Sequence, residues 1–145
     1  MLMKVFNLSY NDKERLAEVY AITGKPYGLI RSLRRGGSGS VRGILQEAPL
    51  EIMKLFEGFS YQKYCNIQEM TNGIIVGFRS RLESYGIPMG FYEIARIDIL
   101  ESKEQDGKVV LVIENRQREI IKIMYSQFES NSIRKFITGL KNHMT

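Results

Sequence analysis

The strongest constraint on the fold is an alternation of apolar and polar residues that recurs in four segments of the second half of the chain. A period of two is typical of a strand with one face in a core and the other in water. The segments are residues 74–82, 94–101, 108–114 and 119–125. In the first segment, the residues expected to face the core are Ile74, Val76, Phe78 and Leu82. Together the segments predict an antiparallel sheet.

Turn-forming residues separate these segments. Asp106-Gly107 is a strong hairpin signal, because glycine accepts the positive φ that tight hairpins need, and residues 115–118 form a polar turn. Residues 85–88 (Tyr-Gly-Ile-Pro) are expected to turn the chain between the first two segments, since glycine and proline interrupt regular structure. Residues 61–67 are a candidate for one further strand.

A helix is predicted after the last strand. Ser130, Asn131 and Ser132 can cap its first turn. Apolar residues then recur every three or four positions, which is typical of a helix with one buried stripe. They are Ile133, Phe136, Ile137, Leu140 and Met144.

The N-terminal part of the chain reads as helix and loop. Residues 9–24 predict a helix that Ser9 or Asn11 caps. Gly24 is suited to its C-terminal cap, and Pro26 cannot continue it.

Further along the chain, residues 27–33 contain a short apolar stretch that is a candidate strand. Residues 36–40 (Gly-Gly-Ser-Gly-Ser) are the most flexible composition in the sequence. Pro49 suits the first position of a second helix, which is predicted over residues 49–58.

These elements predict an α+β fold of one domain over the 145 residues. Its sheet would be a bent antiparallel sheet or a partly open barrel, capped by the C-terminal amphipathic helix. Residues 1–60 would be the helix- and loop-rich portion with a basic, glycine-rich loop, and residues 61–145 the sheet with its helix.

The order of elements in residues 74–142 resembles the later part of a pleckstrin-homology-like domain, in particular the bacterial and GRAM-type members. The resemblance lies in the strand over residues 74–82, in the segment Tyr-Glu-Ile-Ala-Arg-Ile at residues 92–97, in the two hairpins and in the final helix. It implies that the helix stripe plugs one open end of a strongly bent sheet.

The same resemblance implies two kinds of partner. Some members of the family bind inositol phospholipids through a Lys, a gap and then Lys/Arg-x-Arg. Arg79-Ser80-Arg81 resembles the second part of that pattern, and Lys63 is the candidate for the first. Most members of the wider family serve as protein-interaction platforms.

Positive charge is concentrated in one window of the sequence. The net charge is +5, and no acid occurs between Glu18 and Glu47. The remaining 16 Lys and Arg balance the 16 Asp and Glu, so the window accounts for the whole excess. Such a block attracts phosphates or anionic lipid, unless its arginines pair with acids elsewhere in the fold. With the two arginines of the family pattern, the candidate anion-binding residues are Lys25, Arg31, Arg34, Arg35, Arg42, Arg79 and Arg81.

The supply of metal-ligating and nucleophilic residues is small. Cys65 is the only cysteine and His143 the only histidine, whereas a zinc site needs about four ligands. A disulfide within the chain is excluded, and a single cysteine favours a reducing, cytoplasmic setting. We therefore expect no cofactor, no metal and no enzymatic activity, although carboxylate chemistry stays open. The longest aliphatic run, residues 109–113, is far shorter than the about 20 residues of a membrane-spanning helix.

The predicted function is that of a non-enzymatic binding or scaffolding module. It would dock on an anionic, phosphate-bearing membrane surface, at the periphery of the membrane, or on a protein partner. The alternative is nucleic-acid binding through the Arg- and Gly-containing residues 31–43. An exposed sheet edge would also allow a homo-oligomer.

Overall fold

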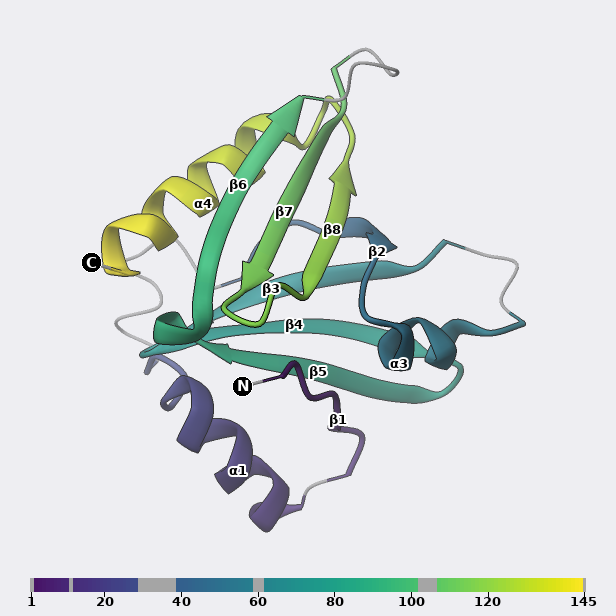
Figure 1. The fold of residues 1–145 in the computed structure, drawn as a ribbon, viewed down its shortest axis with the longest axis vertical. Helices are drawn as coiled ribbons and strands as arrows, with labels where there is room; N and C mark the ends of the chain where they lie inside the picture. Colours follow the sequence, from purple (N-terminus) through teal and green to yellow (C-terminus); the bar gives the residue numbers. More distant parts are fainter. Residues whose placement is uncertain (1, 11, 29–38, 59–61, 102–106, 145) are drawn as a thin grey trace.

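A computed structural model describes residues 2–10, 12–28, 39–58, 62–101 and 107–144 (Figure 1). The helices in these ranges are α1 (Lys13–Thr23), α3 (Leu50–Met53) and α4 (Ser130–Met144), with two 3-10 turns, η1 (Lys54–Phe56) and η2 (Phe91–Glu93). The strands are β1 (Phe6–Asn7), β2 (Gly43–Glu47), β3 (Tyr64–Met70), β4 (Gly73–Ser80), β5 (Glu83–Gly90), β6 (Ile94–Glu101), β7 (Val109–Asn115) and β8 (Ile120–Tyr125).

The eight strands form one antiparallel sheet in the order β1-β5-β4-β3-β2-β8-β7-β6. The sheet is open, with β1 and β6 at its two edges. It is strongly bent, because β3, β4 and β5 run across the direction of β6, β7 and β8, and β2 joins the two groups (Figure 1). The predicted α+β fold, a bent antiparallel sheet with a C-terminal helix, is thereby confirmed.

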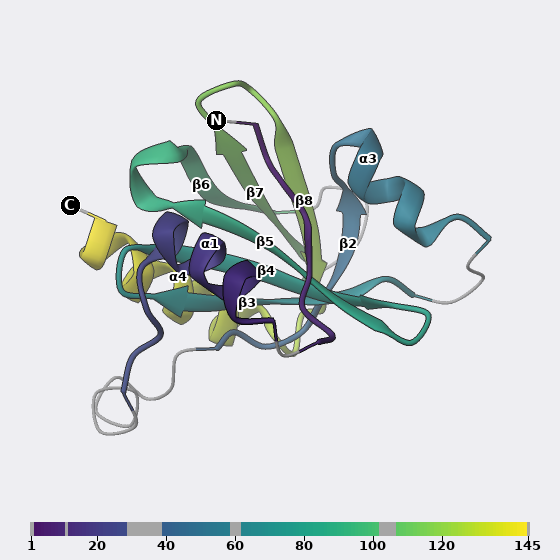
Figure 2. The same cartoon turned by 90° about the horizontal axis from the view of Figure 1, so that it is seen from below.

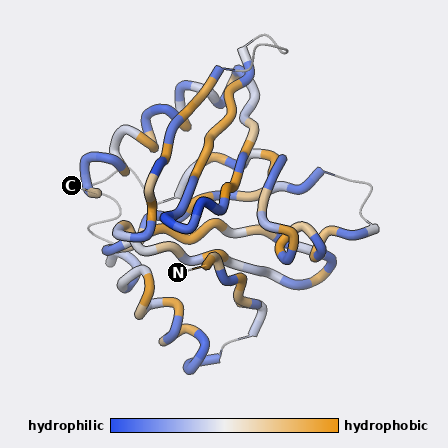
Figure 3. The backbone as a smooth tube through the Cα atoms, in the orientation of Figure 1, coloured by the Kyte–Doolittle hydropathy of each residue, from blue (hydrophilic) through white to orange (hydrophobic). Residues whose placement is uncertain are grey.

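The core fills the space between the two groups of strands. Apolar residues are concentrated along the central strands, and α4 alternates between apolar and polar residues (Figure 3). The stripe predicted for α4 is correct, since Ile133 and Leu140 are completely buried and Ile137 nearly so. Phe136 and Met144 are partly buried against the same core. At another side of the core, Phe56 of η1 packs on Phe78 with ring centroids 4.9 Å apart.

Helix α1 lies on the outer face of the sheet, over β4 and β5 (Figures 1 and 2). This close approach requires glycine, because a Cβ at Gly90 would lie 2.8 Å from the carbonyl oxygen of Ile22 in α1. Gly24 ends the helix with φ +75°, as predicted. The N-cap is Asp12, whose carboxylate accepts hydrogen bonds from the amides of Glu14 and Arg15. Ser9, one of the two caps that the sequence suggested, instead accepts a hydrogen bond from the amide of Ser84 at 2.7 Å.

Two expectations for the first hairpin are wrong. Residues 85–88 belong to β5 and do not turn, and the turn lies at Arg81 and Leu82 instead. Leu82 is therefore not a core residue, and its exposed fraction is 88%. Pro88 is tolerated inside the strand because it lies beyond the part of β5 that pairs with β1, on an edge where a missing N–H costs no ladder bond.

Several other predictions meet the structure only in part. The helix predicted over residues 49–58 is limited to α3 and the following η1. The candidate strand at residues 27–33 and the glycine-rich stretch at residues 36–40 lie mostly outside the described residues, as does Asp106. Gly39 is described, and it forms an isolated bridge with Gln68 of β3.

Candidate anion-binding groove

Next to the hairpin that joins β4 and β5, no described helix lies over the outer face of the sheet (Figure 2). Helix α1 covers the other end of that face. A groove of about 480 Å³ lies at the uncovered end. It is lined by Arg42, Gln62, Tyr64, Cys65, Asn66, Gly77, Phe78, Arg79, Ser84 and Tyr85.

The floor of the groove includes a glycine on its central strand. Asn66 of β3 pairs with Gly77 of β4, and both line the groove, whereas Gly86 of β5, the next residue in the row, is covered by Leu8. The absence of a side chain at Gly77 leaves room for the amide of Asn66, because a Cβ there would lie 3.0 Å from Asn66 Oδ1. The glycine thus allows the Asn66 amide to lie close over the strand at this point.

Strand register brings two of the predicted cations together. Cys65 pairs with Phe78, which places the flanking Tyr64 and Arg79 at neighbouring positions on the outer face. Arg42 precedes β2, and its guanidinium lies over the Tyr64 ring, 4.8 Å from the centroid. Arg42 and Arg79 are both exposed and both line the groove.

The groove lacks negative charge within the described part of the chain. No Asp or Glu is among its lining residues. No described acid forms an ion pair with Arg42 or Arg79. The neutral polar groups beside them are the amides of Gln62 and Asn66 and the hydroxyl of Ser84. Two uncompensated guanidinium groups among hydrogen-bonding side chains are suited to a phosphate or carboxylate.

Cys65 does not add a nucleophile to this groove. Its side chain is on the core face of β3, with an exposed fraction of 2%. Burial raises the pKa of the thiol to about 12, so the thiol stays protonated near neutral pH. The groove therefore contains no thiolate from Cys65 near neutral pH.

The other predicted cations are placed differently. Arg81 lies in the β4–β5 turn with φ +59°, exposed and beside Leu82. Lys25 follows α1 at the opposite end of the sheet, where its carbonyl accepts a hydrogen bond from the amide of Thr71 at 3.0 Å. Arg31, Arg34 and Arg35 lie outside the described residues.

Sequence reasoning missed Gln62, Tyr64, Asn66 and Ser84 as groove residues. Tyr64 and Asn66 do alternate with buried residues in β3, so their exposure was open to prediction. What the sequence does not contain is a local signal for the register that sets them beside Arg79.

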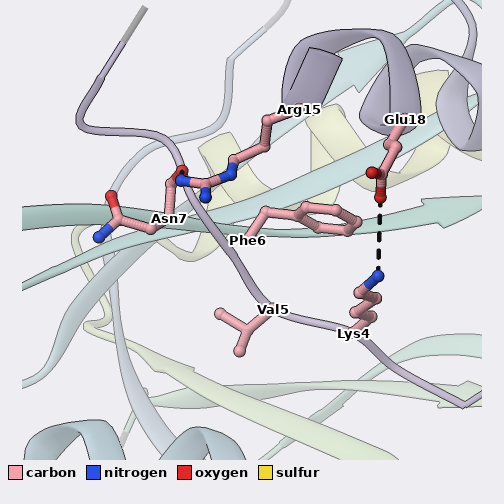
Figure 4. A pocket seen from close by; sticks show the side chains of 6 residues that line it. All are labelled: Lys4, Val5, Phe6, Asn7, Arg15 and Glu18. Atoms are coloured by element: carbon pink, nitrogen blue, oxygen red, sulfur yellow. Dashed lines mark hydrogen bonds and ion pairs between the residues drawn. The ribbon is translucent and has the colours of Figure 1, made fainter. Parts of the chain in front are cut away.

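A second pocket, of about 290 Å³, lies between the N-terminal segment and α1 (Figure 4). It also contains two cations, but both have partners. Lys4 Nζ is 3.6 Å from Glu18 Oε2, and Arg15 donates a hydrogen bond of 2.8 Å to the carbonyl of Asn7. Lys4 also lies over the Phe6 ring, 4.9 Å from the centroid. Both cations of this pocket are thus already engaged by groups of the chain itself.

In the described residues, no group of three or more His, Cys, Asp and Glu side chains is arranged to hold a metal ion. None of the described helices is both long and apolar enough to cross a membrane. No protein-family model matches the chain, and no match was found among curated proteins or solved structures.

Proposed function

We propose that this protein is a non-enzymatic docking module that binds a phosphate-bearing, anionic partner through the Arg42–Arg79 groove. The observation that carries the proposal is that two exposed arginines share a hollow whose lining includes no acid. A partner phosphate would receive charge-assisted hydrogen bonds from both guanidinium groups. The exposed setting implies that this attraction weakens as salt is added.

The proposal is for binding and not for catalysis because of the side chains in the groove. Its described lining has no imidazole and no carboxylate to act as general acid or base. Its one thiol is held in the protonated form by burial.

A membrane surface is one place where such phosphates occur, and the hairpin tip supports that version. Leu82 is 88% exposed and follows the exposed Arg81, while Arg79 lies on the same hairpin. An apolar side chain beside cations can enter the headgroup region while the cations attract anionic lipid. One leucine contributes about 1.5–3 kcal/mol when fully buried, too little for stable attachment without the arginines.

The test is vesicle pelleting at low and moderate salt. Phosphatidylcholine vesicles are compared with vesicles that also contain phosphatidylserine or a phosphatidylinositol phosphate. Inositol hexakisphosphate serves as a phosphate probe free of any membrane. We expect binding of at least one anionic probe, with a marked loss in Arg42→Gln and Arg79→Gln.

Arg96→Gln is the matched control, because Arg96 is also an exposed arginine but its Nε is 2.9 Å from Asp98 Oδ2. The proposal is wrong if every anionic probe behaves as the neutral vesicles do, or if Arg96→Gln reduces binding as much as Arg79→Gln.

A further inference from the structure

We infer that the groove recognises a nucleoside phosphate, that is, a planar base joined to a phosphate, either as a free nucleotide or within a single strand. This inference rests on the proposed function, because it needs the two arginines to bind phosphate. It goes further by assigning a ligand class to the rest of the groove.

The first argument is the aromatic ring. Tyr64 has an exposed fraction of 48%, although it lies within a strand of the sheet and beside the arginines. Arg42 lies over this ring at 4.8 Å and holds it in place from one side. An exposed ring and a guanidinium plane are the two surfaces on which proteins stack nucleobases.

The second argument is the pair of amides. Gln62 and Asn66 line the groove on either side of Tyr64 in the sequence. An amide offers a donor and an acceptor together, which matches the edge of a base. Within the described part of the chain, neither side-chain amide forms a hydrogen bond that would engage it elsewhere. A phosphate alone would need only donors, so the acceptor atoms of these amides point to a ligand with donors of its own.

The third argument is the arrangement of the parts. Tyr64 and Arg79 are neighbours across the β3–β4 pair, and Ser84 pairs with Arg79 across the β4–β5 pair. The stacking surface and a phosphate-binding side chain therefore lie next to each other, at the same end of the Asn66–Gly77 pair. The volume of about 480 Å³ is within the range of about 300–1,000 Å³ that small-molecule sites occupy.

A lipid headgroup explains less of this groove. An inositol or serine headgroup has no flat aromatic face to stack on Tyr64. Leu82, the residue that supports membrane contact, is at the hairpin tip and is not among the lining residues. The base-and-phosphate ligand uses the ring, the amides and the arginines together.

The experiment measures binding to three kinds of probe. Fluorescein-labelled oligo(U) and oligo(dT) are titrated by anisotropy, uridine and adenosine monophosphates by calorimetry, and inositol hexakisphosphate serves as the phosphate probe without a base. We expect Tyr64→Leu to weaken the binding of the nucleotide-bearing probes by about tenfold, which corresponds to the loss of one stacked base. The affinity for inositol hexakisphosphate should stay within about twofold of the wild-type value. Tyr64→Phe keeps the ring and should bind as the wild type does.

Tyr92→Leu is the matched control, because Tyr92 is an exposed tyrosine, 63% exposed, that lies outside the groove. Asn66→Ala tests the amide without changing the ring, and thermal unfolding shows whether each variant is folded. The oligonucleotides and the monophosphates distinguish a strand from a free nucleotide as the source of the ligand.

Binding of inositol hexakisphosphate or anionic vesicles without binding of any nucleotide probe would overturn this inference and leave the proposed function intact. Nucleotide binding that Tyr64→Leu leaves unchanged would overturn it as well. Failure of all anionic probes would remove both proposals.

Discussion

The groove at the β4–β5 hairpin and the pocket beside α1 contain the same contact in two different settings. In each, a cation lies over an aromatic ring, at 4.8 Å for Arg42 over Tyr64 and 4.9 Å for Lys4 over Phe6. Phe6 is only 6% exposed, whereas Tyr64 is 48% exposed. A carboxylate, that of Glu18, completes the pocket beside α1, and no described acid completes the groove.

The comparison shows how to tell a structural cation from one available to a partner. A cation–π pair with a buried ring and an acid nearby already has its partners. In the pocket beside α1, these contacts help to hold the N-terminal segment on the helix. The same pair with an exposed ring and no acid leaves its hydrogen-bond donors to water. Such donors can be transferred to a ligand at a smaller cost, because no ion pair must be broken first.

The largest expected effect concerns the reactivity of Cys65, whose side chain lies on the core side of the strand that lines the groove. Cys65 should react with Ellman's reagent at least about a hundredfold more slowly in the folded protein than in the unfolded chain, because its thiol is buried and its pKa is raised to about 12. The measurement is the labelling rate with and without denaturant. Fast labelling in native buffer would mean that the groove opens through the sheet, and that its floor is not the one described.

The next largest effect is expected from Asn66→Asp, which gives the groove an acid as the pocket beside α1 has one. Asn66→Asp has nearly the same shape and places a carboxylate among Arg42, Arg79 and the ligand. We expect binding of inositol hexakisphosphate to fall by about tenfold or more, since a like charge now opposes the phosphate and the arginines have a partner.

The control for this variant is Gln68→Glu, which adds the same charge at the next outward-facing position of β3 but outside the groove lining. Equal loss of binding in the two variants would indicate a general effect of the added negative charge. It would mean that anion binding does not depend on the groove.

A smaller effect on anion binding is expected when a methyl group is added to the floor of the groove. In Gly77→Ala the new Cβ would lie 3.0 Å from Asn66 Oδ1, so the amide must shift by a few tenths of an ångström. We expect anion binding to fall by about threefold with little change in thermal stability, because alanine fits a strand at least as well as glycine does. Unchanged affinity would show that the position of Asn66 does not matter to the ligand.

The elements whose buried faces are encoded locally were predictable, and those that depend on neighbours were not. The alternation in residues 94–101 and the stripe of α4 each specify a buried face without reference to any other strand. A turn was wrongly expected at residues 85–88 because glycine and proline, here Gly86 and Pro88, are typical of turns. Gly86 admits Leu8 over the strand, and Pro88 lies beyond the residues that pair with β1, so both positions are explained only by where the N-terminal segment runs along β5.

The groove was predictable only in its charges. Arg42 and Arg79 were candidates from the acid-free window and from the family pattern, but they lie in separate parts of the sequence. They share a groove because β2 pairs with β3 and β3 with β4 in one particular register. The resemblance to pleckstrin-homology-like domains stays a prediction, because it rests on element order and no known structure matches the chain.

The smallest effect is expected when the acid is taken from the pocket beside α1. Glu18→Gln removes the partner of Lys4, yet the two side chains are 60% and 65% exposed, so the free energy of unfolding should fall by only about 0.5 kcal/mol or less. Chemical denaturation at low and high salt measures this, and the difference from the wild type should shrink as salt is added. Because Arg15 keeps its bond to the Asn7 carbonyl and Phe6 stays buried, the variant should not acquire binding of inositol hexakisphosphate. If it does acquire such binding, the absence of an acid is sufficient to make an anion site, and the exposed ring and amides of the groove are not needed for one.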